Sequence, residues 1–213
     1  MRLGLACADG RAPAQVLEVL RAAGLCAGEL AAGAPPAFID TAPSPDAEAY
    51  SWLLADAADV LTACERGALD AGLIGKDVLL EAGAEIHELL DLGVPNDALV
   101  HAVAAGPAAA APRSRERVAT RYPRVARRHF MEAGVQVELV TFSAPALAVG
   151  LGLAGGVVEL RSRLGATPRV VLEERAVVAS GSARLVSGRA ARTLVGAALE
   201  DLVERLRGLV VAS

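Results

Sequence analysis

Short apolar runs bounded by glycine, proline or charged residues alternate along this chain with segments of helical period. The runs predict strands at residues 3–8, 71–74, 99–104, 117–120, 135–141, 157–160, 170–179 and 183–186. Apolar residues three or four positions apart predict helices at residues 13–24, 50–58, 60–65, 79–90, 124–133, 146–153 and 189–206. Residues 33–45 hold four prolines and are expected to be mostly loop. This order of elements is typical of α/β proteins with helix-covered, mainly parallel sheets.

Residues 70–80, Asp-Ala-Gly-Leu-Ile-Gly-Lys-Asp-Val-Leu-Leu, combine a predicted strand, a glycine turn and a helix start. Asp77 is expected to cap a helix that begins at Val78. A helix N-terminus after a strand is a natural anion site, and Lys76, the only lysine of the chain, adds a cation there. An ordinary strand-to-helix turn explains the same residues, and from this stretch alone it is the simpler interpretation.

The composition narrows the class of protein. Hydrophobic residues make up 54% of the 213 residues but aromatic residues only 3%, so Ala, Val and Leu must fill the core. A formal net charge of −4 gives no basic field for nucleic acid. Cys7, Cys26 and Cys64 are isolated, which is typical of a reducing cytosol and argues against a disulfide framework or a zinc site. No apolar run reaches the ~18 residues of a membrane span. We therefore expect a soluble, cytoplasmic protein.

Three parts of the sequence are similar to signatures of the short-form ATP phosphoribosyltransferases, the first enzymes of histidine biosynthesis. They are residues 69–79 with 88–93, residues 117–130 with 134–138, and residues 182–186 with the final helix. The resemblance covers nearly the whole chain. It implies an α/β fold of two lobes like a type II periplasmic binding protein, with the ligand cleft between the lobes. Lobe I would comprise residues 1–95 and 180–213, and lobe II residues 96–179.

The resemblance also implies an activity, a cofactor and a partner. The adenine N1 of ATP would displace pyrophosphate from the anomeric carbon of phosphoribosyl pyrophosphate, and Mg²⁺ would hold the polyphosphate. The short forms lack a regulatory third domain and work with a partner that resembles histidyl-tRNA synthetase. We also expect a homo-oligomer.

The expected substrate contacts lie at strand ends and turns. Lys76 and Arg11 would contact phosphate or nucleotide from lobe I, and a solvated turn arginine is the alternative for Arg11. The resemblance places substrate at Thr120, Arg121 and Tyr122 in lobe II. A capping threonine followed by a surface arginine is the alternative interpretation of that segment.

Glu159, at the end of a predicted strand, is the expected ligand of the ribose or of Mg²⁺. The arginines and small residues that follow it complete the expected substrate contacts, and they are Arg161, Arg163, Gly165 and Thr167. Ligands of α/β proteins bind at strand ends. The residues expected to border one cleft between the lobes are therefore Lys76, Arg11, Arg121 and Glu159.

The chain departs from the family where the family binds phosphate. The family loop reads roughly Ser/Thr-Gly-x-Thr-Leu, whereas residues 161–167 read Arg-Ser-Arg-Leu-Gly-Ala-Thr. Asp9 replaces a lysine, Asp56 an arginine, and Ala146 and Gly155 two acidic residues. A like-charge contact at 4 Å costs roughly 1 to 4 kcal/mol. Two hypotheses follow: an active phosphoribosyltransferase whose isolated chain turns over weakly, or a catalytically silent relative that acts as a nucleotide-binding or regulatory subunit. A solute-binding-like protein is a third, weaker interpretation.

Overall fold

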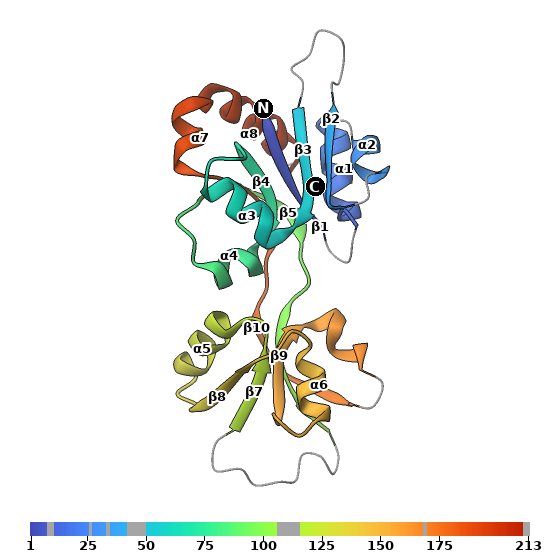
Figure 1. The fold of residues 1–213 in the computed structure, drawn as a ribbon, viewed down its shortest axis with the longest axis vertical. Helices are drawn as coiled ribbons and strands as arrows, with labels where there is room; N and C mark the ends of the chain where they lie inside the picture. The colour runs from blue at the N-terminus through green and yellow to red at the C-terminus, as the bar shows by residue number, and fades with distance from the viewer. Residues whose placement is uncertain are drawn as a thin grey trace. The chain divides into compact units, whose positions relative to one another are not determined.

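The structure is a computed structural model that describes residues 1–7, 11–25, 27–32, 35–41, 50–105, 116–167 and 170–210. The chain divides into two compact units, each built on its own sheet (Figure 1). The first comprises Met1–Leu79, Gly83–Pro95 and Ser182–Ser213, and the second comprises Leu80–Ala82 and Asn96–Gly181. The expected α/β class is confirmed.

The first unit holds a six-stranded sheet in the order β2-β3-β1-β4-β11-β5. Its strands are β1 (Arg2–Cys7), β2 (Ala37–Thr41), β3 (Tyr50–Asp56), β4 (Ala71–Gly75), β5 (His87–Pro95) and β11 (Ser182–Ser187). β1 runs parallel to both β3 and β4, whereas β2, β11 and β5 pair antiparallel with their neighbours. The carboxyl ends of β1, β3 and β4 therefore lie at one edge of the sheet, where α/β proteins place their ligands.

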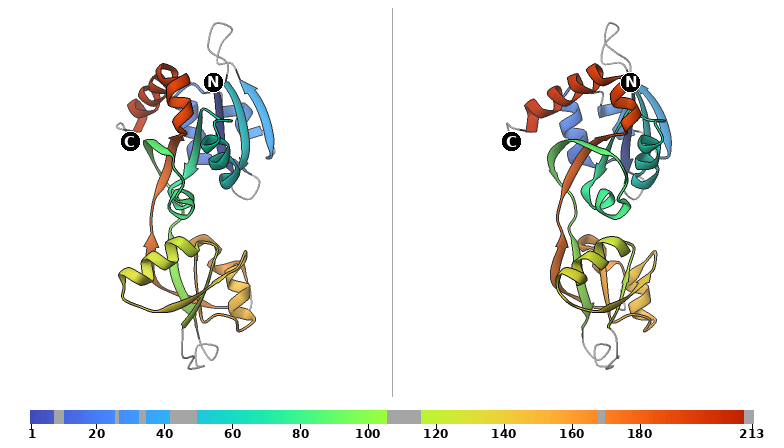
Figure 2. Two further views of the ribbon diagram at one scale, coloured as in Figure 1. Left: turned by 60° about the vertical axis from the view of Figure 1, so that its left-hand side comes forward. Right: turned by 90° about the vertical axis from the view of Figure 1, so that its left-hand side faces the viewer.

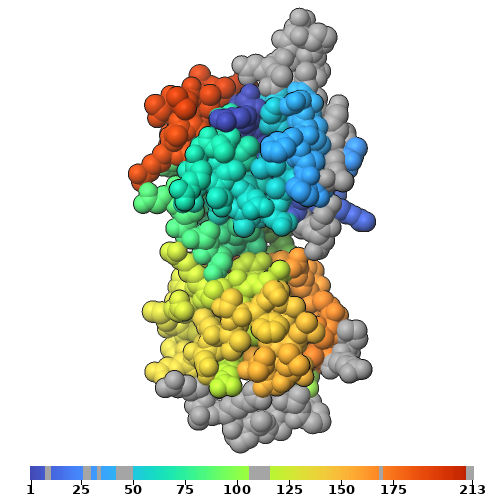
Figure 3. All heavy atoms as spheres, in the orientation of Figure 1, coloured from blue at the N-terminus to red at the C-terminus, as the bar shows by residue number. Residues whose placement is uncertain are grey.

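Helices cover both faces of this sheet. They are α1 (Ala14–Ala22), α2 (Ala27–Ala32), α3 (Ala57–Glu65), α4 (Lys76–Ala82), α7 (Arg189–Leu194) and α8 (Gly196–Val210). Side chains alternate along β1, so Leu3 and Leu5 join one apolar cluster with Leu20 of α1 and Leu206 of α8. Each fully buried leucine contributes ~1.5 to 3 kcal/mol of stability. α3 covers the opposite face (Figures 1 and 2). Residues of β3 and α3, cyan and teal, form the front of this unit in the space-filling view (Figure 3).

Glycine lets α3 approach the sheet closely. A Cβ atom on Gly4 of β1 would lie 2.6 Å from Val60 Cγ1, and one on Gly72 of β4 would lie 2.8 Å from the same atom. Both distances are shorter than ordinary carbon contacts, so a larger residue at either strand position would require Val60 or α3 to shift. The packing of α3 in turn fixes Asp56 at its amino end, beside the carboxyl end of β1.

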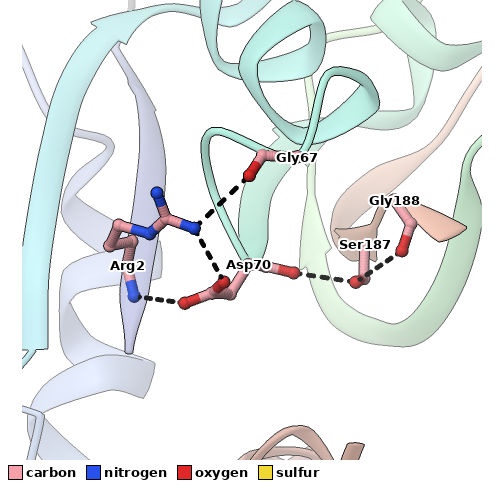
Figure 4. A network of polar contacts seen from close by, with 5 residues as sticks. All are labelled: Arg2, Gly67, Asp70, Ser187 and Gly188. Atoms are coloured by element: carbon pink, nitrogen blue, oxygen red, sulfur yellow. Dashed lines mark hydrogen bonds and ion pairs between the residues drawn. The ribbon is translucent and has the colours of Figure 1, made fainter. Parts of the chain in front are cut away.

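A polar network joins three strands at the opposite edge of the sheet (Figure 4). The buried Asp70 carboxylate accepts a hydrogen bond from Arg2 N at 2.7 Å, and Arg2 Nη2 lies 3.4 Å from its other oxygen. Ser187 Oγ donates to the Asp70 carbonyl at 2.7 Å. Hydrogen bonds to charged groups contribute ~1.5 to 3 kcal/mol. This network therefore stabilises the register of β1, β4 and β11.

The second unit holds a five-stranded sheet in the order β10-β6-β9-β7-β8. Its elements are β6 (Leu99–Ala104), β7 (Glu116–Thr120), α5 (Pro123–Glu132), β8 (Val137–Thr141), α6 (Pro145–Gly150), β9 (Gly156–Leu160), the 3-10 helix η2 (Arg161–Ala166) and β10 (Leu172–Ala179). β7 runs parallel to β8 and β9, so their carboxyl ends share one edge. α6 packs with Ala119 and Val157 on one face, and α5 packs with Val118 and Val158 on the other.

The secondary structure differs from the sequence prediction in two segments, residues 50–58 and residues 33–45. The first were expected to be helical, but Tyr50, Trp52 and Leu54 are buried in alternation and form the inner strand β3. The second range was expected to be mostly loop, but residues 37–41 pair with β3 as the edge strand β2, and residues 33–34 and 42–45 lie outside the described residues. The sheet surroundings decide both outcomes, because an apolar run of this length fits either a strand or a buried helix.

A short helix and a long strand replace the single helix expected over residues 79–90. α4 begins at Lys76 with Gly75 as its N-cap, so the expected cap by Asp77 is wrong. The helix ends because Gly83 takes a left-handed conformation with φ of +56°, which favours glycine. β5 then follows at the edge of the sheet.

The last expected helix, over residues 189–206, is two helices. Val195 leaves helical geometry, with φ of −131° and ψ of 30°, and separates α7 from α8. The other strands and helices expected within the described ranges are confirmed to within a few residues. None of the helices in these ranges is long and apolar enough to span a membrane.

His101 on β6 is a partly buried titratable group of the second unit. Its Nε2 is buried and has no hydrogen-bond partner among the described residues. The centroid of its ring lies 5.0 Å from that of Phe130 and 6.4 Å from that of His129. Burial is the main cause that lowers its pKa; His129 and Arg175 lower it further, and Glu116 opposes them.

Because the folded His101 takes up a proton at lower pH than the unfolded chain, the free energy of unfolding should fall as the pH drops below about 6.5. Urea denaturation between pH 5 and pH 8 measures this slope. We expect His101→Phe to flatten it and the matched His87→Phe change in the first unit to leave it unaltered. A slope that survives His101→Phe would assign the effect to other groups.

Candidate functional site

A cavity of about 140 Å³ lies at the carboxyl edge of the second sheet. Its apolar walls are Pro145 and Ala146 of α6, Val157 of β9, Leu164 of η2 and Leu172 of β10. Its polar and charged lining consists of Arg121, Ser143, Glu159, Arg163 and Thr167. Four of the residues expected from the sequence, namely Arg121, Glu159, Arg163 and Thr167, thus lie around one cavity.

An ion pair between Arg121 and Glu159 forms the centre of this lining. Thr120 pairs with Val158 in the parallel register of β7 and β9, so the residues that follow, 121 and 159, lie side by side. Arg121 Nε is 3.4 Å from Glu159 Oε2, and this contact is an ion pair without a hydrogen bond at Nε. The side chains are 33% and 6% exposed, which leaves the arginine accessible to a ligand while the carboxylate is nearly covered.

Opposing effects act on the Glu159 carboxyl. Burial, the largest, raises its pKa, and the nearby Asp97 raises it further. The Leu160 N–H, which donates to Oε1 at 2.9 Å, and the Arg121 guanidinium lower it. The net direction is upward. A buried carboxylate of this kind depends on its cation, so any loss of Arg121 favours the protonated form.

Thr120 holds Arg121 in place rather than contacting the cavity. Its side chain is fully buried; Oγ1 donates to the Val158 carbonyl at 2.8 Å and accepts from Tyr122 N at 2.8 Å. These bonds fix the turn from β7 into α5. Tyr122 is the N-cap residue of α5 and is not among the residues that line the cavity. Both hydrogen bonds of the Thr120 hydroxyl go to backbone groups, and Thr120 does not line the cavity, so a direct substrate contact by this residue stays a prediction.

The residues after β9 separate into two groups. Arg163 and Thr167 line the cavity, whereas Arg161 and Gly165 do not. Arg161 instead makes a two-pronged ion pair with Glu174, with Nε to Oε2 at 2.8 Å and Nη2 to Oε1 at 2.7 Å. The expected substrate contacts by Arg161 and Gly165 are thus not supported by the geometry.

The two replaced acidic positions of the second unit differ in their relation to the cavity. Ala146 is buried and lines it, so a larger acidic side chain would project into this space. Gly155 precedes the amino end of β9, and its N–H donates to the Arg117 carbonyl. Because strands rise about 3.3 Å per residue, Gly155 lies far from the carboxyl edge. Its replacement does not alter the cavity.

Three residues of the first unit that the sequence analysis related to substrate binding lie at or after the carboxyl ends of β1, β3 and β4. Arg11 is exposed and follows β1, Asp56 ends β3, and Lys76 begins α4 directly after β4. Asp9 lies outside the described residues. The pKa of Cys7 is raised to about 11, mainly by burial and secondly by the negative charge of Asp56. The Asp56 carboxylate therefore lies close to the end of β1.

Lys76 belongs to a balanced ionic cluster that the sequence interpretation did not include. Its ammonium group pairs with Glu88 of β5. Nη1 of Arg184, on β11, lies 2.7 Å from Asp91 Oδ2 and 3.9 Å from Glu88 Oε2. Asp91 also accepts hydrogen bonds from Ser182 and from the Gly93 amide, and these contacts lower its pKa, with Ser182 the largest cause. The sequence signal that could have predicted this cluster is the pair of acidic residues, Glu88 and Asp91, in the segment 88–93 that carries the resemblance.

A family model described as HisG: ATP phosphoribosyltransferase matches residues 56–208. The chain belongs to the ATP phosphoribosyltransferase family. A curated ATP phosphoribosyltransferase of Symbiobacterium thermophilum is 35% identical, with 97% of this chain and 94% of the relative covered. One of Pseudomonas paraeruginosa is also 35% identical, with 99% and 98% covered. The resemblance stated from the sequence is confirmed, and membership assigns the chain to a family of glycosyltransferase-type enzymes.

Solved structures with the same fold include an ATP phosphoribosyltransferase and a solute-binding protein. The ATP phosphoribosyl transferase (HisG:HisZ) complex from Thermotoga maritima contains a chain that matches with a TM-score of 0.71 at 19% identity and full coverage of both chains. The alkanesulfonate-binding protein SsuA from Xanthomonas axonopodis pv. citri matches with a TM-score of 0.54 at 15% identity, covering 97% of this chain and 71% of that one. The expected likeness to periplasmic binding proteins is confirmed.

Proposed function

We propose that this chain transfers the phosphoribosyl group of phosphoribosyl pyrophosphate to N1 of ATP or a related purine nucleotide. Family membership over nearly the whole chain supports the reaction class. The observation that carries the proposal for this chain is the cavity at the carboxyl edge of the second sheet, lined by the Arg121–Glu159 pair together with Arg163 and Thr167. Histidine biosynthesis, or a secondary pathway that uses the same reaction, would be its setting, in the cytoplasm.

The lining suits the phosphoribosyl end of the substrate. Arginine forks onto phosphate oxygens with two parallel hydrogen bonds, and the Thr167 hydroxyl adds another donor. The cavity of about 140 Å³ is smaller than the ~300 to 1,000 Å³ of pockets that enclose a whole ligand. It would therefore hold the phosphorylated ribose, while the pyrophosphate extends beyond it. We propose that Glu159 accepts a hydrogen bond from a ribose hydroxyl and orients the sugar.

The reaction needs little covalent help from side chains. The lone pair of adenine N1 forms a bond to the anomeric carbon, and the bond from that carbon to pyrophosphate breaks with its electrons remaining on the leaving group. The protein must therefore position both substrates and stabilise negative charge on the departing pyrophosphate. Arg121, which is accessible and adjacent to the ribose position proposed for Glu159, is the cation best placed for this in the second unit. Arg11 and Lys76 remain predicted contacts of the first unit.

We propose that a divalent cation reaches this chain as a companion of the substrate. Among the described residues, no three His, Cys, Asp or Glu side chains lie close enough together to hold a metal. Mg²⁺ commonly binds through substrate phosphates, waters and one or two carboxylates. We propose Mg²⁺ on the polyphosphate, with Glu159 as the one protein ligand offered by the cavity. When bound, the ion would neutralise charge on the leaving pyrophosphate.

We further propose that the chain acts with other subunits. The Thermotoga maritima neighbour was solved as a HisG:HisZ complex. By analogy, the expected partners of this chain are a regulatory subunit that resembles histidyl-tRNA synthetase and further copies of itself.

A second candidate function is a catalytically silent subunit that binds nucleotide. The observation that favours it is that two cations expected to bind phosphate are already paired with carboxylates, Lys76 with Glu88 and Arg161 with Glu174. Neither cation would meet a polyphosphate without first leaving its carboxylate partner.

Formation of phosphoribosyl-ATP with Mg²⁺, with and without the synthetase-like partner, separates the two functions. We expect turnover with the partner present, in the ordinary enzyme range of ~1 to 10³ per second, and weak or absent turnover by the isolated chain. Binding of phosphoribosyl pyrophosphate without turnover under either condition would establish the silent subunit instead.

A further inference from the structure

Two carboxylates outside η2 hold the start of this 3-10 helix. Asp97 Oδ2 accepts hydrogen bonds from both the amide and the hydroxyl of Ser162, the amide at 2.9 Å. Glu174 of β10 accepts both donors of the Arg161 guanidinium fork, at 2.7 and 2.8 Å. Arg161 N also donates to the Ala98 carbonyl at 2.9 Å. The first two residues of η2 are thus fastened to two different segments of the second unit.

Apolar packing alone does not fix this helix. None of its residues is buried, and its N-cap, Leu160, makes no side-chain cap hydrogen bond. Leu164 is only partly covered, at the edge of the cluster around α6. The polar contacts of Arg161 and Ser162 therefore determine where η2 lies on the sheet.

The position of η2 decides the shape of the cavity. Arg163, Leu164 and Ala166 of η2 line it, together with Thr167. Asp97 and Glu174 do not line it, so their hydrogen bonds reach the cavity through η2. Asp97 also raises the pKa of Glu159 through its charge. Hydrogen bonds to a bound phosphate need donor–acceptor distances of about 2.7 to 3.2 Å, so the affinity of the cavity depends on where η2 holds Arg163 and Thr167, and the two anchors fix that position.

We infer that Asp97 and Glu174 are positioning residues that set the affinity for phosphoribosyl pyrophosphate by anchoring η2. This inference rests on the proposed function. Arg161 balances the charge of Glu174. Asp97 is held by the two neutral donors of Ser162 and keeps its charge, which acts on Arg161 and on Glu159.

Calorimetric titration of phosphoribosyl pyrophosphate into the full chain with Mg²⁺ tests the inference. Glu174→Gln and Asp97→Ala should each weaken binding by roughly ten- to a hundredfold. Asp97→Asn should keep most of the affinity, because its amide oxygen still accepts from the Ser162 amide. Glu173→Gln is the matched control: Glu173 lies on the same strand, is exposed and pairs with Arg175 at 3.2 Å, and this change should leave affinity unaltered.

A charge exchange separates anchoring from direct contact. In Arg161→Glu with Glu174→Arg the ion pair is reversed but present, so binding should recover to within a few-fold of the parent if the pair positions the loop. In the activity assay the single variants should raise KM for phosphoribosyl pyrophosphate and leave kcat at saturation nearly unchanged, a split that general unfolding would not produce.

Either of two results would overturn the inference alone: parent-like binding by both Glu174→Gln and Asp97→Ala, or a charge exchange that binds as weakly as Glu174→Gln. The second result would assign Arg161 a contact with the ligand itself. Absence of phosphoribosyl pyrophosphate binding by the parent chain would overturn the proposed function, and this inference with it.

Discussion

Replacing Arg121 with glutamine should lower the rate of phosphoribosyl transfer by roughly 10²- to 10³-fold, the usual cost of removing one group that stabilises developing charge. The variant also leaves Glu159, which is 6% exposed, without its cation. Loss of one partner of a fully buried ion pair costs about 3 to 5 kcal/mol of stability, and the cost here should be smaller because Arg121 is 33% exposed and Glu159 can take up a proton. The rate should therefore be measured together with the free energy of unfolding.

Two further variants separate catalysis from folding. Arg121→Gln with Glu159→Gln removes both charges, so it should regain much of the lost stability while remaining inactive. Arg117→Gln is the matched control on the same strand, because Arg117 pairs with Glu138 at 2.9 Å and both side chains are nearly half exposed. It should change neither rate nor stability appreciably. A double variant that regains the parent rate would remove Arg121 from the active site.

Changing Gly188 to alanine should destabilise the first unit by about 3 kcal/mol or more, the range of severe overpacking. A Cβ atom at this position would lie 2.2 Å from the carbonyl oxygen of Cys64, a backbone atom of α3 that cannot turn aside. Gly188 precedes α7, so the close contact joins the last segment of the unit to α3. Urea denaturation followed by circular dichroism measures the loss.

Gly208→Ala is the matched control for this prediction. Gly208 lies within α8, where nothing stands within 4 Å of the added Cβ atom. Alanine should stabilise an open helical position by about 0.5 to 1 kcal/mol. Equal stability of the two variants would show that α3 and residue 188 are not in close contact.

Apart from β3, the strands in the interiors of both sheets could be predicted from the sequence because their apolar runs are short and bounded by glycine, proline or charged residues. The errors fall where an apolar segment fits two structures equally well. Residues 50–56 are such a case: their neighbours β1 and β2 make them a strand, and neither neighbour can be inferred from the segment itself. Residues 76–95 are another, because the left-handed Gly83 ends a helix that a periodic pattern would continue.

The candidate site was predictable where residues follow parallel strands. Arg121 and Glu159 were expected together because strand ends of an α/β sheet meet at one edge, and the register of β7 and β9 brings them to 3.4 Å. The sequence could not show which groups were already engaged. Arg161 and Lys76 read as anion-binding cations, but Glu174 and Glu88 pair with them from strands distant in the chain. Such pairings depend on tertiary structure and leave no local signal.

A crystal structure of the chain with phosphoribosyl pyrophosphate and Mg²⁺ tests the central claim most directly. We expect the phosphorylated ribose in the cavity of the second unit, with the 5′-phosphate within hydrogen-bond distance of Arg163 and Thr167 and the ribose beside Glu159. Arg121 should lie within reach of the pyrophosphate. A ligand bound elsewhere, with this cavity filled only by water, would contradict the account.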